Sequence, residues 1–390
     1  MLYNLRHLRV FLEVVDHHSV TRAAEICNLS QPAVTQGLSK IEGSLGVSLF
    51  TRTPQGLFVT PSGNVLARRV RRAFNYLDPA LKELGPRLHI VATASQLQAL
   101  IAVRESQNFT LAARRMGLAQ PTVHRAIGQL EQEAARPLFE RTAYGIVATR
   151  LTQALAQAAQ LAFGELSQAE VDLADSLQEE AGRVVVGAMP LSRSFLLPRA
   201  IAAFRQVRPT TPVHIVEGPY ADLLARLRCG EIDFLIGALR FPAPIGDVEQ
   251  TELFSDTLAV VAGNHHPLAA QDNISIELLA SYPWIVGQKG TPLRGHFDAL
   301  FETAGHVAAS IIESSSLILM RELLSITDHL GCISYLQAQA ELSRGLLKAL
   351  PLDLSHTARP IGLTRRLDWM PTKAQTQFLA LVSDACTAAD

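Results

Sequence analysis

The side chains best suited to chemistry in this sequence form a polar group that begins near residue 30 and recurs at helical spacing. They carry hydroxyl, amide and ammonium groups, which donate hydrogen bonds to base edges and phosphates. With a proline in the first turn, the group comprises Ser30, Gln31, Pro32, Thr35, Gln36, Ser39 and Lys40. Arg52 supplies a further cation downstream. The chemistry that these residues indicate is non-covalent recognition of a polyanion.

Residue patterns typical of catalysis are not found elsewhere in the sequence. There is no Ser/His/Asp set or carboxylate pair at a convincing spacing, and no GxGxxG or phosphate-binding loop. His265 and His266 precede Pro267 and are interpreted as loop residues. The cysteines are too far apart for a metal site and are interpreted as buried or idle thiols: Cys27, Cys229, Cys332 and Cys386. We therefore predict a protein that is not an enzyme and holds no metal and no cofactor.

The polar group has a counterpart further along the chain. A shift of 89 residues aligns SVTRAAEICNLSQPAVTQGLSKIE (19–42) with NFTLAARRMGLAQPTVHRAIGQLE (108–131) without a gap, and residues 48–60 with 137–149. The first 150 residues are therefore predicted to hold two copies of one small module. The second copy supplies Gln120, Pro121, Thr122, His124, Arg125 and Arg141 as candidate DNA contacts.

The charge of the chain is divided unevenly. Residues 1–150 hold 18 Lys and Arg against 10 Asp and Glu, whereas the remainder holds 17 against 26. This division predicts a polyanion partner for the front half only. The N-terminus lacks the pattern of a signal peptide, and no apolar run reaches the 18 or more residues of a membrane span. We therefore expect a cytoplasmic protein with no membrane contact.

Within the first copy, the apolar spacing predicts three helices followed by a wing. A helix with one apolar face runs from about Leu5 to Val15, and a short second helix starts near Val20. Ser30 is a good N-cap for the third helix. Two β-prone stretches near residues 49–50 and 57–60, joined by Pro54-Gln55-Gly56, predict a hairpin. This is the winged helix-turn-helix arrangement, and the alternative is a helical packing module with no ligand.

Two longer helices are predicted after the two copies. The first spans about residues 65–81, where Pro79 is expected to end or kink it. Its arginines (Arg68, Arg69, Arg71 and Arg72) either approach DNA or form a solvated face. The second spans about residues 151–177 with one narrow apolar seam, which predicts that it pairs with another helix.

At this point the sequence resembles the LysR-type transcriptional regulators. The first copy matches their N-terminal pattern through Ala23-Ala24, Ser30-Gln31-Pro32-Ala33-Val34, Leu45-Gly46, Leu49-Phe50-Thr51-Arg52 and Thr60-Pro61-Ser62-Gly63. It departs at Thr35-Gln36, where the family usually has Ser-Arg, so one cationic contact is missing. The resemblance implies that copy one reads double-stranded DNA. We hypothesise that the two copies form a pseudo-dimer on two unlike half-sites, with copy one dominating affinity.

The second copy resembles the family more loosely. Ala119 stands at the position of the capping serine, and Ala134-Ala135 at that of Leu-Gly. We weigh a second DNA reader against a structural or dimer-forming relic. In the resembled family the long linker helix makes the dimer contact, which implies a homodimer or homotetramer through residues 151–178.

From Arg183 onward, short buried strands alternate with helices, which predicts an open α/β domain with parallel strands. The order of elements resembles the two-lobed LysR effector domain. Ligands in such sheets bind beyond the carboxyl ends of the strands. The residues placed there are Ser192, Arg193, Gly218, Tyr220, Thr291, Arg294, Ser314 and Ser315. They suit a small carboxylate, although each residue taken alone is more readily interpreted as a cap or turn former. Arg294 is equally well interpreted as a solvated helix residue.

The predicted fold is mixed: two winged helix-turn-helix domains and a two-lobed α/β effector domain resembling type 2 periplasmic binding proteins. The domains are expected at 1–63, 64–94 (linker), 95–150, 151–182 (linker and hinge) and 183–390, with lobes of about 183–260 plus 350–390 and 265–345. The expected function is a transcription regulator of LysR type that binds DNA and a small-molecule effector, with RNA polymerase as a further partner. The alternative is a cytoplasmic solute-binding protein or an enzyme on the same two-lobed fold, with the helical front half as an interaction module.

Overall fold

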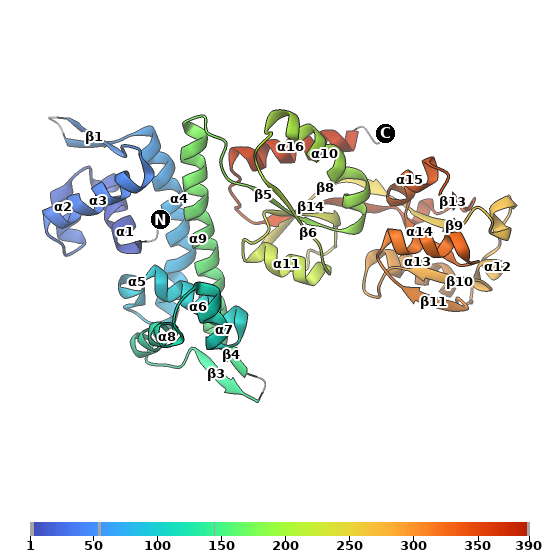
Figure 1. Ribbon diagram of the computed structural model, residues 1–390, viewed down its shortest axis with the longest axis horizontal. Helices are drawn as coiled ribbons and strands as arrows, with labels where there is room; N and C mark the ends of the chain where they lie inside the picture. The colour runs from blue at the N-terminus through green and yellow to red at the C-terminus, as the bar shows by residue number, and fades with distance from the viewer. Residues whose placement is uncertain (1–3, 54–55, 144, 388–390) are drawn as a thin grey trace. The chain divides into compact units, whose positions relative to one another are not determined.

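The computed structural model describes residues 4–53, 56–143 and 145–387 (Figure 1). The chain divides into two compact units, Met1–Gly182 and Arg183–Asp390. Each unit has its own hydrophobic core: one continuous core in the first, and separate cores for each lobe in the second. The two units are described separately.

The first unit contains the two predicted copies, each with three helices and a two-stranded wing. Copy one consists of α1 (Leu5–His17), α2 (Val20–Ile26), α3 (Gln31–Leu45), β1 (Phe50–Thr53) and β2 (Gly56–Val59). Copy two consists of α6 (Ala94–Ser106), α7 (Phe109–Met116), α8 (Gln120–Ala134), β3 (Phe139–Thr142) and β4 (Gly145–Ala148). The helix-turn-helix and the wing predicted for copy one are confirmed.

The repeat extends to single hydrogen bonds. In copy one the Glu42 carboxylate accepts the Leu49 N–H at 2.8 Å, which ties α3 to the wing. In copy two Glu131 accepts the Leu138 N–H at 2.9 Å. Both pairs are separated by the 89-residue shift, so the duplicated sequence forms the same local structure twice.

Along the chain, α4 (Pro61–Leu84) and α5 (Leu88–Val91) connect the two copies, and α9 (Arg150–Ser176) follows copy two. The sequence predicts that Pro79 ends or kinks the first long helix. The helix does not end there, because α4 continues to Leu84. Pro79 removes the donor for the Asn75 carbonyl, and both residues are on the exposed side of α4. Leu77, Leu81 and Leu84 are buried around Pro79, and this packing outweighs the local propensity.

The second unit has two lobes, each built on a five-stranded sheet. The first sheet has the order β6-β5-β7-β14-β8, formed by β5 (Val184–Ala188), β6 (Val213–Val216), β7 (Phe234–Ala238), β8 (Val248–Asp256) and β14 (Arg359–Arg366). Its helices are η1 (Ser192–Leu196), α10 (Leu197–Val207), α11 (Tyr220–Arg228) and α16 (Lys373–Thr387). Helices α10 and α16 cover one face and α11 the other (Figure 1). The tail helix therefore packs on the first lobe, as predicted.

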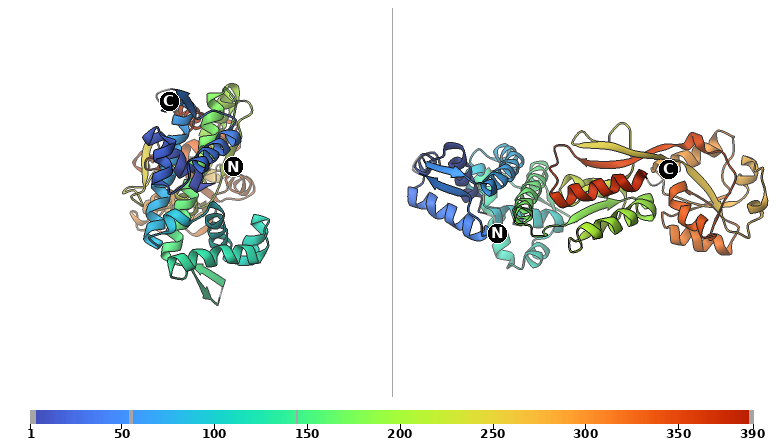
Figure 2. Two further views of the ribbon diagram at one scale, coloured as in Figure 1. Left: turned by 90° about the vertical axis from the view of Figure 1, so that its left-hand side faces the viewer. Right: turned by 90° about the horizontal axis from the view of Figure 1, so that it is seen from above.

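The second sheet has the order β11-β10-β12-β9-β13, formed by β9 (Leu258–Ala262), β10 (Pro283–Val286), β11 (Ser310–Glu313), β12 (Leu330–Ser334) and β13 (Lys348–Ala349). Its helices are η2 (Pro267–Ala270), α12 (Ile276–Ala280), α13 (Pro292–Glu302), α14 (Leu317–Ile326), α15 (Tyr335–Ser343) and η3 (Ser355–Thr357). The paired strands β8 and β14 run from the first lobe toward the second (Figure 2).

The chain enters the second lobe earlier than the sequence predicts. Residues 258–260 are expected in the first lobe, but β9 lies in the second sheet, where it pairs antiparallel with β12. The crossing falls between Asp256 at the end of β8 and Leu258 at the start of β9. Ser255-Asp256-Thr257 is a short polar cluster at this point, but the β-prone residues on its two sides do not show that the strands belong to different sheets. Only the long-range pairing separates them.

Candidate nucleic-acid interface and ligand pocket

The polar face of α3 is open on the surface of copy one. Val34, Leu38 and Ile41 are buried on the inner side of the helix. The outer side exposes Gln31, Pro32, Gln36, Ser39 and Lys40, with Thr35 half-buried. Five of these residues line one open surface hollow together with Val20: Gln31, Pro32, Thr35, Gln36 and Ser39. The residues predicted to face a duplex groove therefore form one continuous polar surface.

Local structure fixes the orientation of α3. The Ser30 hydroxyl accepts the Ala33 N–H at 3.4 Å, which caps the helix, and Gly46 ends it in the left-handed conformation at φ 69°. Ser30 is itself exposed beside the polar face. Burial lowers the pKa of His7, and the cations Lys40 and Arg6 lower it further. His7 is therefore neutral near pH 7 and adds no charge beneath the face.

The wing of copy one carries the predicted phosphate contact. Arg52 is exposed on β1, and β1 pairs antiparallel with β2. Of the predicted wing turn, Pro54 and Gln55 lie outside the described residues, and Gly56 begins β2 at φ 136°. A positive φ of this kind favours glycine.

Copy two presents an equivalent surface with different chemistry. Val123, Ile127 and Leu130 are buried on the inner side of α8. The outer side exposes all five residues predicted there: Gln120, Pro121, Thr122, His124 and Arg125. The His124 ring lies against Phe109, with 5.0 Å between ring centroids, and Arg141 is exposed on β3.

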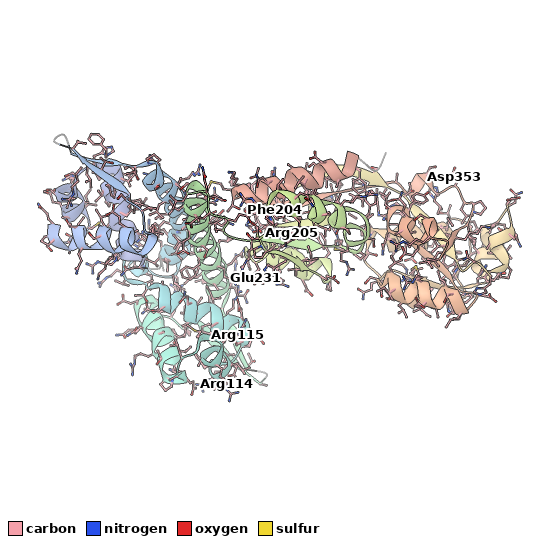
Figure 3. The ribbon with its side chains drawn as sticks, turned by 45° about the horizontal axis from the view of Figure 1, so that its top comes forward. Arg114, Arg115, Phe204, Arg205, Glu231 and Asp353 are labelled. Atoms are coloured by element: carbon pink, nitrogen blue, oxygen red, sulfur yellow. The ribbon has the colours of Figure 1, made fainter. Side chains whose placement is uncertain are left out.

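Sequence reasoning missed two exposed cations of copy two. Arg114 and Arg115 lie on α7 (Figure 3), the first helix of the helix-turn-helix pair, which crosses the DNA backbone in this arrangement. Arg115 approaches Glu105 at 3.1 Å. The alignment of the copies contains the signal, because it places these arginines at the positions of Glu25 and Ile26.

The arginine run of α4 differs from both of its predicted roles. Arg69 is fully buried and donates to Glu165 and Asp172 of α9, each at 2.8 Å. Arg72 is half-buried and donates to Glu165 at 2.9 Å, and Arg71 pairs with Asp16. Of the four, Arg68 alone is exposed with no ion pair among the described residues. The predictions of DNA approach and of a solvated face are therefore wrong for Arg69, since carboxylates of a distant helix enclose it.

The second unit contains a cavity of about 630 Å³ lined by residues of both lobes. Six of the eight predicted effector residues line it: Arg193, Gly218, Tyr220, Thr291, Ser314 and Ser315. Thr291 caps α13 through its hydroxyl, which accepts the Arg294 N–H at 3.3 Å. Most of the residues that were selected because they lie beyond strand ends therefore line the same cavity.

The other two predicted residues, Ser192 and Arg294, are not among those lining the cavity. Ser192 is buried in η1, and its hydroxyl donates to the Met189 carbonyl at 2.7 Å. Arg294 is buried beside α13, where it donates to Asp298 at 2.7 Å and to Glu313 at 2.6 Å. The structure therefore contradicts a ligand contact for either side chain, and for Arg294 it also contradicts the solvated alternative.

Several polar residues of the cavity were missed by sequence reasoning: Glu217, Arg240, Gln288, Lys289, Ser334, Gln337 and Arg359. Arg240 follows the carboxyl end of β7, so the same strand-end rule could have found it. Its guanidinium lies 3.9 Å from the centroid of the Tyr220 ring. Arg359 begins the antiparallel strand β14, to which a rule for parallel strands does not apply.

The electrostatics of the cavity favour an anion. Four cationic residues line it against one acidic residue, Glu217, which pairs with Arg193. Burial lowers the pKa of Arg359, and the neighbouring Asp256 opposes that change. Burial raises the pKa of Asp256, while a hydrogen bond from Ser334 and the charge of Arg359 oppose the rise.

Three arginines of the cavity also have buried N–H groups without a hydrogen-bond partner in the described part of the chain. Arg193 Nε, Arg240 Nε and Arg359 Nη1 are buried and have no hydrogen-bond partner among the described residues. A buried donor without a partner costs about 1–3 kcal/mol, which an anionic ligand would offset. The cationic lining of the cavity therefore suits a ligand that carries negative charge.

Two further kinds of site were sought in the described part of the chain. No group of three or more His, Cys, Asp and Glu residues there could hold a metal ion. No helix there is long and apolar enough to cross a membrane.

Comparison with known proteins gives matches along the whole chain. Residues 177–387 match the LysR substrate binding domain, and residues 5–64 and 94–154 each match the bacterial regulatory helix-turn-helix protein family of LysR type. The HTH-type transcriptional regulator GalR of Pseudomonas putida is 32% identical over 99% of this chain and 98% of its own length. PcaQ of Agrobacterium fabrum, also an HTH-type transcriptional regulator, is 28% identical over 97% and 94%.

Solved structures show the same fold over a smaller share of the chain. Full-length OxyR from Pseudomonas aeruginosa has a TM-score of 0.55 at 23% identity, covering 75% of this chain and 94% of its own. CbnR in complex with its target DNA has a TM-score of 0.53 at 18% identity, covering 75% and 99%. Each of these two solved structures therefore leaves a quarter of this chain without a counterpart.

Proposed function

Because this chain belongs to the LysR family of bacterial helix-turn-helix regulators, we propose that both of its winged modules contact DNA and that its cavity binds a small carboxylate. The chain is a DNA-binding transcription regulator controlled by a small-molecule effector, and it is not an enzyme. The proposal concerns which residues carry these two activities.

The DNA contacts are assigned to the outer faces of α3 and α8. Gln31, Thr35 and Gln36 begin α3, where recognition-helix side chains reach base edges in the major groove. Arg125 in copy two offers the bidentate donor that suits guanine. The wing residues Arg52 and Arg141 contact phosphates. The observation that supports these assignments is the exposure of both polar faces over buried apolar ones.

The two readers are proposed to bind unlike half-sites about one helical turn apart, as a pseudo-dimer within one chain. Both copies belong to one compact unit, and the long helices α4 and α9 pack against each other between them. The differences between α3 and α8 predict an operator without full palindromic symmetry.

The DNA assignment is tested on an operator selected from a random-sequence DNA library with the full chain. A gel-shift experiment then compares the selected site with a shuffled site of equal length. We expect tighter binding to the selected site, whose protected region spans two unlike half-sites. Protection of one half-site only would contradict the role assigned to copy two.

The effector is proposed to be a small carboxylate bound by Arg193, Arg240 and Arg359. The unused buried donors of these three arginines carry the assignment. Thr291, Ser314 and Ser315 line the same cavity and supply hydroxyls for the rest of the ligand. We propose the domain positions expected from the sequence, with the hinge at 178–182 and the crossing between the lobes moved to between Asp256 and Leu258. We also propose that the chain, as a DNA-bound regulator, acts in the cytoplasm.

The effector assignment is tested by thermal shift on the full chain. Benzoate and gluconate are the probes, with benzamide and glucose as uncharged counterparts. We expect a carboxylate to raise Tm by mass action and Arg193→Gln or Arg240→Gln to abolish the rise. Arg365→Gln is the matched control, because Arg365 lies on β14 but pairs with Glu249 at 2.8 Å. Equal shifts with uncharged counterparts would contradict a carboxylate.

A further inference from the structure

Helices α4 and α9 pack along one another inside the first unit, and their apolar positions repeat with the same 89-residue shift as the two copies. Six buried positions of α4 correspond to six buried positions of α9. They are Leu66 and Leu155, Ala67 and Ala156, Val70 and Ala159, Ala73 and Ala162, Leu77 and Leu166, and Leu84 and Leu173. The apolar seam alone would therefore also fit α4 against another α4, or α9 against another α9.

A polar network in the same seam does not repeat. Arg69 has 1% of its side chain exposed and donates to Glu165, which has 6% exposed. Arg69 also donates to Asp172 at 2.8 Å and to Gln168 at 2.8 Å. The shift places Ala158 at the position of Arg69 and Tyr76 at that of Glu165. Arg69 and Glu165 thus each lack a counterpart in the other helix, whereas Asp172 corresponds to Glu83, which is exposed.

The overall charges of the two helices are complementary. Helix α4 carries five cationic and two acidic residues, whereas α9 carries one cationic and four acidic residues. The acidic residues of α4 do not replace Glu165. Asp78 already accepts from Arg9 at 2.9 Å, and Glu83 is exposed. The sole cation of α9, Arg150, is fifteen residues from Glu165, or about 22 Å along a helix.

We infer that the Arg69–Glu165–Asp172 network specifies pairing of α4 with α9 of the same chain, so that one chain carries a complete two-reader head. An α4–α4 contact would bury two arginines without carboxylates, and an α9–α9 contact would bury carboxylates without cations. Removing a charge from water without a partner is strongly unfavourable. The chain's own α9 is also present at the millimolar effective concentration typical of a tethered partner.

The inference changes where chains can meet. The sequence predicts a homodimer or homotetramer through residues 151–178, but the apolar side of α9 is already covered by α4. Contacts between chains must therefore use other surfaces, and each added chain brings two more DNA readers. The inference stands on the seam itself and does not depend on the DNA contacts proposed above.

Charge reversal in the full-length chain tests the specification. Arg69→Glu and Glu165→Lys should each lower the Tm of the first unit by on the order of 10 °C, and the double variant should recover at least half of that loss. Arg68→Glu is the matched control, because it makes the same change on the exposed side of α4. If either reversed chain fails to fold, Arg69→Gln and Glu165→Gln give the same double-mutant cycle with smaller charge changes.

Mixing separates pairing within a chain from pairing between chains. Arg69→Glu and Glu165→Lys chains with different tags are unfolded together, refolded and measured for Tm and mass. Pairing within a chain predicts no recovery in the mixture, because every chain keeps one reversed charge. Recovery in the mixture, additive losses in the double variant, or an Arg68→Glu loss equal to that of Arg69→Glu would each overturn the inference. None of these measurements requires DNA. A failure of the helix-pairing inference can therefore be distinguished from a failure of the proposed DNA contacts.

Discussion

Copy one and copy two share one backbone and differ in what they offer to DNA. Copy one, over residues 1–63, holds five Lys and Arg against four Asp and Glu, whereas copy two, over 95–150, holds seven against four. The added cations of copy two include Arg114, Arg115 and Arg125, at the positions of Glu25, Ile26 and Gln36. The comparison suggests that duplication freed one copy to supply charge while the other kept the recognition pattern.

The exposed side chains of the two recognition helices also differ in how many of them are held against the protein. Copy one presents Gln36 and Lys40 exposed and Thr35 half-buried. Among the described residues, no hydrogen bond or ion pair holds these three side chains to the protein. In copy two the residue at the position of Lys40 is Gln129, which accepts from Gln96 at 3.0 Å and is thereby held against α6. His124 is likewise held against Phe109. Copy two therefore has fewer free side chains for reading bases and more cations for phosphates.

The largest expected effect comes from removing base-reading groups of copy one. Thr35→Ala with Gln36→Ala should weaken binding to the selected operator about 100-fold, since each good base contact is worth about 1–3 kcal/mol. The matching change His124→Ala with Arg125→Ala should cost about tenfold. Fluorescence anisotropy on operator and shuffled DNA measures both variants. Equal losses in the two copies would remove the distinction drawn here.

A smaller effect is expected from the cations of α7. Arg114→Gln with Arg115→Gln should weaken binding to operator and shuffled DNA alike, by about tenfold at low salt. The slope of log K against log salt should flatten by about 0.9, since each neutralised phosphate contributes about 0.9 and Arg115 already pairs with Glu105 at 3.1 Å. Arg22→Gln, on α2 of copy one, is the control, because Arg22 already pairs with Glu25 at 2.9 Å. A loss confined to the operator would instead make α7 a base reader.

The recognition surfaces could be predicted from the sequence because they depend on local rules. Helical period separates Val34 and Leu38 from the polar face, and Ser30 with Pro32 marks where the helix begins. The repeat then transfers each assignment to copy two. Local hydrogen bonds and caps determine these positions, so knowledge of distant partners was not needed.

Most of the errors concern residues whose environment is set by distant parts of the chain. Arg69 lies on an arginine-rich helix, and nothing local shows that Glu165 and Asp172, about 100 residues away, will enclose it. Arg359 joins the cavity through a strand that returns from the second lobe. Ser192 was expected at a helix start facing the cleft, but η1 turns its hydroxyl back to Met189. Tertiary pairing decided the positions of Arg69 and Arg359, whereas a local hydrogen bond three residues back decided that of Ser192.

The smallest expected effect concerns the helix caps, where the two copies differ by one oxygen atom. Ser30 caps α3 through the Ala33 N–H, whereas Ala119 leaves the start of α8 without a side-chain cap. Ala119→Ser should therefore stabilise the first unit by about 1 kcal/mol, and Ser30→Ala should destabilise it by a similar amount. Urea unfolding of the full chain measures both changes.

Exchanging the cap residues also tests whether the missing side-chain cap of α8 affects DNA binding. Backbone N–H groups at a helix start bind phosphates, and an uncapped start leaves one more of them available. If Ala119 serves phosphate binding, Ala119→Ser should stabilise the chain yet weaken its binding to shuffled DNA two- to threefold. If the stabilised variant binds shuffled DNA as tightly as before, the missing cap is only a loss of stability. The charge difference between the copies would then rest on their arginines alone.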